Sequence, residues 1–398
     1  MALVRFFVSR LKHSFWALPL IGCLLGVGLA AGTYYLDAPG AGDLYAALPE
    51  FTRIQPESAR TLLGAIAGAM ATMLSLTYTL TLVVFTLAAG TLAPRLLESF
   101  SDNRANQMTI AILGATFVFA LVSLYLLSEN SEARFTALAA IFLAMISVGA
   151  LVYFVHDVAN RVLVDNEIAR AAGRLKTAVA RDFLPEPPPS VSDLRPLLGR
   201  GVEIRALRSG YIQTIDEAPL LTRACEHETF IELEIQPGDF IAEGCRIARL
   251  HGGSEKHWTQ AIDKALLTGA ARTSDRDVLF CVNLLVEIAL RALSPGINDS
   301  FTAVRCVDQL SAAMVQASRL HPRARIRFDR DGQPRMATPT VTLEALLSAA
   351  FEPICQNAED NALVQAALKR AFDRIESVAP AEHLPMIQKK AERVSDAA

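Results

Sequence analysis

The sequence predicts a membrane protein in two parts: an all-α bundle of four transmembrane helices, followed by a cytoplasmic α+β domain. The 398-residue chain has a mean hydropathy of +0.31 and is 52% hydrophobic, which is high for a soluble protein of this length. The apolar excess lies almost entirely before Val155, whereas most Arg, Asp and Glu residues follow it. We therefore assign the transmembrane domain to residues 1–156 and the cytoplasmic part to the remainder.

Four apolar stretches reach the roughly 20 residues that a helix needs to cross a bilayer. They are residues 15–36, 61–93, 108–128 and 135–155, and none contains Lys, Arg, Asp, Glu or His. Coupled transporters usually carry ionisable residues at membrane depth, so the sequence disfavours coupled transport. An anchor or a passive pore remains, and the loop at 98–104 would contribute to the selectivity of a pore.

Basic residues predict the orientation, because Lys and Arg in short loops stay on the cytoplasmic side. They precede the first span, separate the second from the third, and follow the fourth, whereas the other loops are biased towards acidic residues. Both termini are therefore expected in the cytoplasm. A cleaved signal peptide ending near Ala30 and Ala31 is the alternative, but its apolar run exceeds the usual signal core.

Small and hydroxyl-bearing residues follow one stripe of the second span when it is projected as a helix. The stripe contains Gly64, Gly68, Thr72, Ser75, Thr79 and Thr86. Close helix packing is the favoured explanation, and a hydroxyl-lined water or ion path in an oligomer is the alternative. The patterns Gly22xxxGly26, Gly28xxxGly32 and Gly64xxxGly68 offer more small-residue faces than one bundle needs, which predicts a homo-oligomer.

The cytoplasmic part begins with a helical stalk and a Pro-rich linker at residues 157–190. Apolar residues at three-to-four spacing predict an amphipathic stalk helix that continues the fourth span, and we favour packing on its own domain over a coiled-coil stem. A β-rich module follows at 191–255. Its segments RSGYIQTID and PGDFIAEG resemble the barrel-sandwich hybrid of lipoyl and biotinyl domains. The Met-Lys-Met hairpin of those domains is absent, so the resemblance implies a structural module without a cofactor.

Residues 256–398 are predicted to be mainly helical, with one hairpin that turns at Asp331 and Gly332. Expected helices cover residues 259–267, 275–293, 300–318, 342–356, 360–377 and 383–394. Thr273 or Ser274 is expected to cap the second of these helices, and Asn298 or Asp299 the third.

Six polar residues near the second of these helices are candidates for a cytoplasmic ligand pocket. They are Arg276, Asp277, Glu287, Arg291, Asn298 and Asp299. The alternative, which we favour, is a structural helix-turn-helix corner with satisfied caps.

Composition and motifs exclude several function classes. A net charge of −3 gives no basic surplus for binding nucleic acid. The six cysteines form no CxxC pair and no zinc spacing with histidine, so we expect reduced thiols and no metal. P-loop, GxSxG, HExxH and GxGxxG motifs are absent and the seven histidines are scattered, so we expect neither an enzyme nor a cofactor.

The segments FTLAAGTLAPRLLESFSDNRANQMTIAILGATF and VEIALRALSPGINDSFTA, together with the sheet motifs, resemble the bacterial family "domain of unknown function 2254" of membrane proteins. The resemblance implies a bacterial inner-membrane location, whereas the family name carries no activity. Two expectations follow for an oligomer in the lipid bilayer. The first, slightly favoured, is a channel-like or passive transport protein gated by its cytoplasmic domain. The second is a non-conducting scaffold or sensor whose cytoplasmic domain binds a partner or ligand. The sequence does not identify the ion, solute or ligand.

Overall fold

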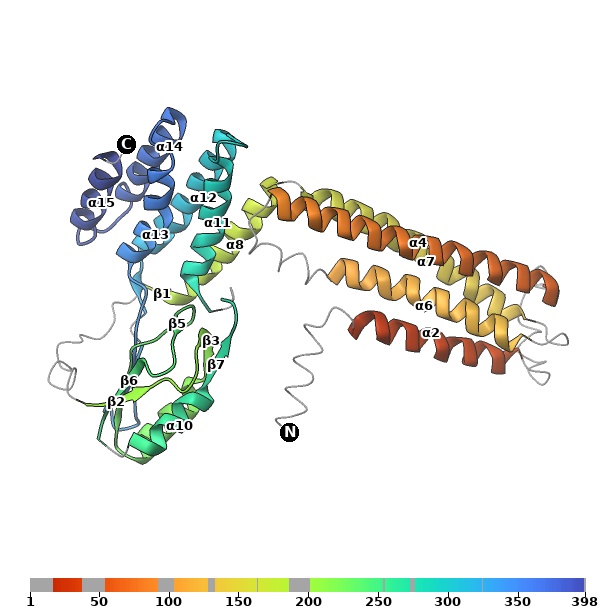
Figure 1. Cartoon of the computed structure of the whole chain (residues 1–398), viewed down its shortest axis with the longest axis horizontal. Helices are drawn as coiled ribbons and strands as arrows, with labels where there is room; N and C mark the ends of the chain where they lie inside the picture. Colours follow the sequence, from red (N-terminus) through yellow and green to blue (C-terminus); the bar gives the residue numbers. More distant parts are fainter. Residues whose placement is uncertain are drawn as a thin grey trace. The chain divides into compact units, whose positions relative to one another are not determined.

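A computed structural model describes residues 17–37, 54–91, 104–127, 133–162, 164–185, 201–252, 255–272, 276–323 and 325–396. Two compact units divide the chain, Met1–Val164 and Asp165–Ala398 (Figure 1). The division lies close to the predicted domain boundary at residue 156. The 98–104 loop, apart from Arg104, most of the Pro-rich linker, Thr273 and Ser274 lie outside the described residues.

The N-terminal unit contains four helices that correspond to the four predicted spans. They are α2 (Ala17–Leu36), α4 (Pro56–Thr91), α6 (Arg104–Leu126) and α7 (Arg134–Val162). Each is long and apolar enough to cross a membrane. Helix α6 is the centre of the bundle, because it makes the most extensive contacts with the other three helices. Half of its most apolar window is buried, against 28% or less in the other helices.

Glycine permits the close approach of α2 to α6. An added Cβ at Gly22 would lie 2.5 Å from the carbonyl oxygen of Ala111, and one at Gly26 would collide with that of Ala115. The Gly22xxxGly26 pattern therefore packs within this chain, as small-residue patterns do in membranes. The Gly28 and Gly32 positions instead face open space.

Several buried polar groups in the bundle are paired, which lowers the cost of placing them in an apolar environment. Asp37, which follows α2, accepts hydrogen bonds from the backbone N–H groups of Phe135 and Thr136 at 3.0 Å each. Its carboxylate thus satisfies free donors at the start of α7. The hydroxyl groups of Thr116 and Ser147 lie 2.9 Å apart and join α6 to α7.

The C-terminal unit contains a five-stranded sheet in the order β2-β6-β4-β10-β9. Its strands are β2 (Val202–Arg205), β6 (Arg246–His251), β4 (Phe230–Leu233), β10 (Pro334–Thr338) and β9 (Arg325–Phe328). Strands β4 and β10 are parallel, and the other neighbours are antiparallel. The β9–β10 hairpin confirms the predicted turn, in which Gly332 has a φ of +76°.

A three-stranded antiparallel sheet, β5-β3-β7, lies in the same unit. It contains β5 (Phe240–Ile241), β3 (Gly210–Ile215) and β7 (Leu266–Gly269). Helices α9 (Glu217–Glu226) and α10 (Glu255–Ala265) share a buried core with both sheets, which includes Leu220 and Trp258. The predicted barrel-sandwich module needs correction: among the described residues the strands do not close into a barrel. Helix α9 occupies the connection between β3 and β4, and sheet pairing extends beyond residue 255 to β7, β9 and β10.

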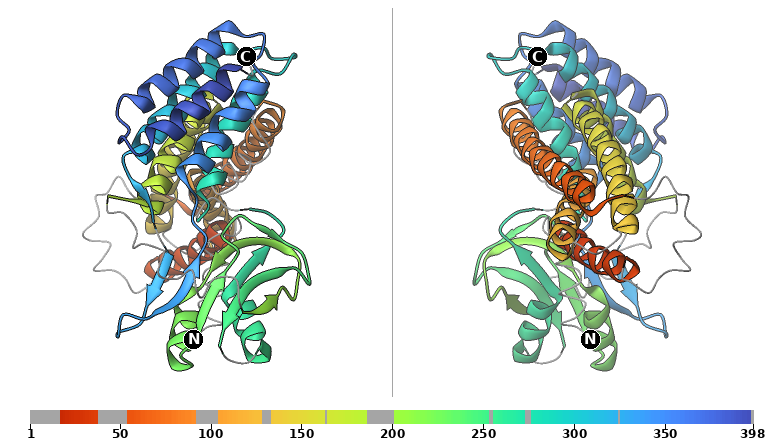
Figure 2. Two further views of the ribbon diagram at one scale, coloured as in Figure 1. Left: turned by 90° about the vertical axis from the view of Figure 1, so that its left-hand side faces the viewer. Right: turned by 90° about the vertical axis from the view of Figure 1, so that its right-hand side faces the viewer.

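The remaining helices gather at the other end of the C-terminal unit from the strands (Figure 2). They are α8 (Val164–Asp182), α11 (Val278–Ala292), α12 (Ser300–Ser318), α13 (Leu343–Gln356), α14 (Ala362–Glu376) and α15 (Leu384–Asp396). All but α8 match predicted helices of the 256–398 region to within a few residues. A short pair, β1 (Phe183–Leu184) with β8 (His321–Pro322), links the end of α8 to the chain after α12.

Helix α8 is the predicted stalk, and it packs on its own domain as expected. Its apolar face is buried, with Leu175 and Val179 fully inaccessible. Asp165 at its start lies 2.5 Å from Arg305 of α12. Burial raises the pKa of the neighbouring Cys281 thiol on α11 to about 11, so this cysteine remains a protonated core residue.

Candidate anion-binding site

The six predicted pocket residues do not form one site. Arg276 and Asp277 precede α11, whereas Asn298 and Asp299 follow it, so the 15-residue helix places the two pairs about 20 Å apart. Asp299 caps α12 by accepting hydrogen bonds from the backbone N–H and hydroxyl of Thr302 at 3.1 and 2.6 Å. These bonds lower the pKa of the Asp299 carboxyl. The C-terminal end of α11 therefore agrees with the structural helix-turn-helix corner, which was the favoured interpretation of these residues.

Glu287 and Arg291 lie one turn apart within α11 and are half-buried. Asn298, in the connection to α12, has a φ of +49°, and its side chain is exposed. Of the six predicted residues, only Arg276 lines the cavity described below.

The predicted stripe on α4 is exposed along its described length. Gly64, Gly68, Thr72, Ser75, Thr79 and Thr86 all lie on the accessible face of the bundle. An added Cβ at Gly64 or Gly68 would meet no atom within 4 Å. The Thr72 and Thr79 hydroxyls bond to carbonyl oxygens one turn earlier at 3.1 and 2.9 Å. The stripe therefore does not pack against other described parts of this chain.

A cavity of about 260 Å³ lies in the C-terminal unit, where the strands meet the helices. It is lined by Arg181, Asp182, Thr214, Ile215, Asp216, Glu217, Ile235, Pro237, Arg276, Arg323, Arg327 and Thr338. These residues come from the end of α8, the β3–α9 turn, the loop after β4, the start of α11, and strands β9 and β10 with their approach from β8. Four arginines against three carboxylates give the cavity a net positive charge.

Two of the four arginines are neutralised. Arg181 donates from Nε and Nη2 to the two carboxylate oxygens of Asp182 at 3.0 and 2.8 Å. This hydrogen bonding raises the pKa of the Arg181 guanidinium above its usual value. Arg327 donates to Oε2 of Glu217 from the same two nitrogens at 3.2 and 3.0 Å. These arginines shape the cavity without leaving free positive charge.

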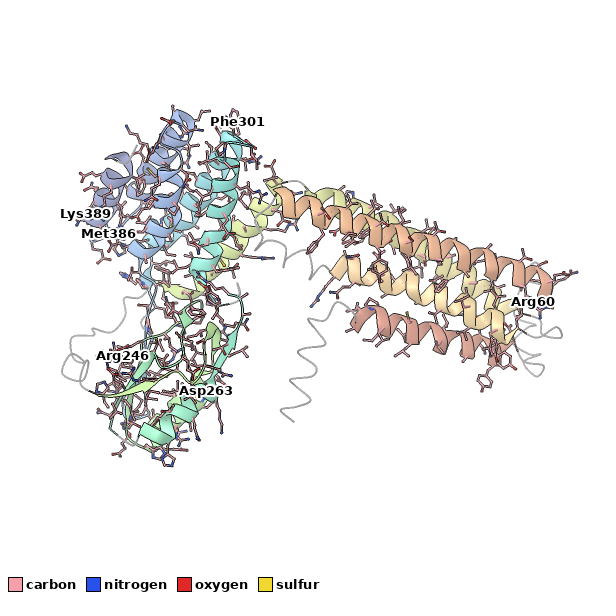
Figure 3. The ribbon with its side chains drawn as sticks, in the orientation of Figure 1. Arg60, Arg246, Asp263, Phe301, Met386 and Lys389 are labelled. Carbon is pink, nitrogen blue, oxygen red and sulfur yellow. The ribbon has the colours of Figure 1, made fainter. Side chains whose placement is uncertain are left out.

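Arg276 and Arg323 are the remaining arginines, and the carboxylate of Asp216, which also lines the cavity, offsets one of their two positive charges. The guanidinium of neither residue has an ion-pair or hydrogen-bond partner in the described parts of the chain. Arg246 of β6 (Figure 3) is a contrasting, fully paired arginine of the same unit. It forms ion pairs with Glu234 at 2.6 Å and with Glu203 at 3.1 Å. The buried Thr338 hydroxyl oxygen also lacks a hydrogen-bond partner there. The cavity thus presents two free guanidinium groups and a free hydroxyl, which are donors suited to an anion.

The sequence Pro237-Gly238-Asp239 fixes one edge of the cavity. Gly238 has a φ of +98°, and an added Cβ would collide with the carboxylate of Asp277. That carboxylate is buried, pairs with Arg272 at 2.6 Å, and accepts the N–H of Phe280 at 2.9 Å. Asp277 therefore caps α11, where the sequence predicted Thr273 or Ser274. Glycine is required here because the turn crosses directly against this ion pair.

Sequence reasoning selected Arg276 but missed the other donors of the cavity. Arg181, Arg323, Arg327 and Thr338 are separated by up to about 160 positions, and no local motif contains them. Pairing of β1 with β8 and of β10 with β4 brings their segments together. A surplus of arginine in the 319–335 region was the available signal, but a hairpin of that composition is more often simply solvated.

Comparisons with known proteins place the chain in a family. The family described as "Predicted membrane protein (DUF2254)" matches residues 12–374. Uncharacterised proteins of Mycobacterium bovis and Mycobacterium tuberculosis are each 27% identical over 391 residues, covering 92% of this chain and 73% of theirs. No solved structure matches it. The family and the four apolar helices support a membrane location, and the chain belongs to the DUF2254 family of predicted membrane proteins.

Proposed function

We propose that this protein is a membrane-embedded sensor whose C-terminal unit binds a small anion carrying phosphate or carboxylate groups. One observation carries the proposal: Arg276 and Arg323, neither of which forms an ion pair with a described residue, share a net positive cavity with the free hydroxyl of Thr338. A single exposed arginine without a partner would carry little weight. The volume of about 260 Å³ suits a compact ligand.

The path of the chain offers a way for ligand binding to act on the membrane helices. Arg181 and Asp182 end α8, and α8 begins two residues after α7 ends. An anion drawn to Arg323 competes with Asp182 for Arg181 and so acts on the end of this helix. The proposed setting is a homo-oligomer in a bacterial inner membrane, with both termini in the cytoplasm, as the basic flanking residues predict.

Ligand-dependent thermal stabilisation tests the sensor proposal. Purified full-length protein in detergent is titrated with inorganic phosphate and with a small dicarboxylate. Binding to the native state raises the unfolding midpoint, and saturation at 100 times Kd corresponds to about 2.7 kcal/mol. We expect Arg276→Gln and Arg323→Gln each to weaken binding at least tenfold.

Arg330→Gln is the matched control, because Arg330 is an exposed arginine in the β9–β10 turn outside the cavity. It should bind like the unmodified protein. Equal responses of all three variants, or no stabilisation by either probe, would refute the sensor proposal.

A channel is the second candidate, supported by the exposed stripe on α4. Six small or hydroxyl-bearing residues face away from the bundle of their own chain, so an oligomer could bring copies of the stripe together. The threonine hydroxyls already bonded to backbone carbonyls keep lone pairs for water or ions. The cytoplasmic unit would then gate the pore.

Cysteine labelling distinguishes the two candidates. In a variant without native cysteines, Thr72→Cys, Ser75→Cys and Thr79→Cys should react with hydrophilic thiol reagents if the stripe lines water. Leu80→Cys is the control, because this half-buried residue lies about 80° or more around α4 from each of the three positions and should remain protected. Uniform protection in an oligomeric sample, or a monomer mass by light scattering, would eliminate the channel.

A further inference from the structure

Three potential metal ligands converge at one surface of the C-terminal unit, and none of them lines the arginine cavity. His321 belongs to β8, and Glu382 and His383 immediately precede α15. Their ligand atoms all lie within 4.8 Å of one another, the one such group of three in the described part of the chain. The sequence gives no hint of this cluster, since 61 residues separate His321 from Glu382 and neither histidine is part of a metal motif.

We propose that His321, Glu382 and His383 bind a divalent transition-metal ion of the zinc class. Two imidazoles and one carboxylate form a donor set that such ions accept. The Glu382 oxygen lies 3.8 Å from Nδ1 of His321 and 3.9 Å from Nε2 of His383. These separations are too long for hydrogen bonds, so the three donors approach one another without bonding among themselves.

The surroundings of His383 orient it for this role. Its Nδ1 lies 2.9 Å from the carbonyl oxygen of Ser318. Because a carbonyl only accepts, Nδ1 must carry the proton, and the neutral ring then presents the lone pair of Nε2 towards Glu382. Metal-binding histidines commonly use their second nitrogen in this way, which fixes the tautomer and the ring direction.

Small movements bring the group to coordination geometry. Ligand bonds of about 2.0–2.2 Å in a tetrahedral site place donor atoms roughly 3.3 Å apart. Glu382 is 59% exposed and free to adjust, whereas His321 and His383 are 24% and 18% exposed and are held by packing. Three protein ligands leave a fourth position for water or an external ligand, and neutral histidines with one carboxylate leave one net positive charge on the ion.

The competing explanation is a surface pair of histidines that attract Glu382 only when protonated. That arrangement does not predict stoichiometric binding of a metal ion. The two explanations therefore differ in metal binding by the whole protein, which is measurable without any assay of activity. The cluster shares no residue with the arginine cavity, so its test is independent of the sensor proposal.

The test is Zn²⁺ titration of the full-length protein in detergent, after chelator treatment, in competition with a chromophoric chelator. A Cys245→Ser background removes an exposed thiol that would also bind zinc. We expect one equivalent to bind, and His321→Ala and His383→Ala each to weaken binding at least tenfold. His257→Ala, on an exposed histidine of α10, is the control and should bind normally.

Glu382→Gln provides a second test of zinc binding if a histidine variant fails to fold. The substitution should not affect folding, because this exposed side chain makes no hydrogen bond in the described structure. It should weaken zinc binding by the same order while circular dichroism stays unchanged. Absence of one-equivalent binding in the Cys245→Ser protein would overturn the proposal. So would equal affinity of the His383→Ala, Glu382→Gln and His257→Ala proteins.

Discussion

Gly238 illustrates how one residue can join two parts of a domain. Its turn is anchored to β3, because its N–H donates to the carbonyl oxygen of Ile212 at 2.8 Å, and it passes against the buried carboxylate of Asp277. Burial also raises the pKa of the adjacent Asp239 carboxyl. A side chain at position 238 would have to displace an ion pair that also caps α11.

We therefore predict that Gly238→Ala destabilises the C-terminal unit more than Gly244→Ala does. Both glycines have positive φ, +98° and +80°, so both substitutions incur backbone strain of about 1–2 kcal/mol. A Cβ at Gly244 meets no atom within 4 Å, whereas one at Gly238 collides with Asp277. Disturbing the buried carboxylate should add roughly 1–3 kcal/mol, measurable by urea unfolding. Equal destabilisation would show that the contact with Asp277 is unimportant.

At the scale of elements, α2 provides a matched pair of positions within one helix. Gly26 faces α6, where a Cβ would collide with the carbonyl oxygen of Ala115, and Gly28 faces open space. We predict that Gly26→Ala destabilises the bundle by about 1–3 kcal/mol through overpacking. Gly28→Ala should be neutral or stabilising, since alanine favours helix. Scanning fluorimetry in one detergent compares their unfolding midpoints, and a lower midpoint for Gly28→Ala would contradict this helix packing.

Local patterns in the sequence predicted the helices well and their contacts poorly. The predicted helix at 300–318 has the same bounds as α12, because Asp299 caps it and the apolar spacing is regular. Partners were harder to predict, since Gly22, Gly28, Gly64 and Gly68 look alike in sequence. Only the direction each faces in the bundle, a property of tertiary packing, distinguishes a packed glycine from an open one.

The candidate site was predicted only in part, for a similar reason. Arg276 was recognised because it precedes a helix with a clear apolar pattern. Arg323 and Thr338 reach the same cavity through strand pairing over long sequence separations, which no periodicity encodes. The barrel-sandwich expectation failed at α9, where apolar residues at helical spacing, including Leu220 and Ala224, outweighed the resemblance of the flanking strands.

For the whole molecule, we predict that both termini lie on the cytoplasmic side. A reporter active only outside the cytoplasm should be silent when fused after Arg10, Ser101 or Ala398 and active after Asp43. The physical reason is the retention of short Arg- and Lys-rich loops in the cytoplasm. Activity of the fusion at Ala398 would overturn this orientation, and with it any access of cytoplasmic anions to the cavity.

The parallel pairing of β4 with β10 has a consequence for folding during synthesis. Ile231 lies opposite Met336, so one edge of β4 has no partner until the ribosome has added about another hundred residues. At about 5–20 residues per second, this delay is roughly 5 to 20 seconds. The four apolar helices are made first, so the nascent chain meets the membrane while its C-terminal unit still exposes an unpaired strand edge. Such an edge is a template for aggregation, and early termination before residue 334 would leave it permanently open.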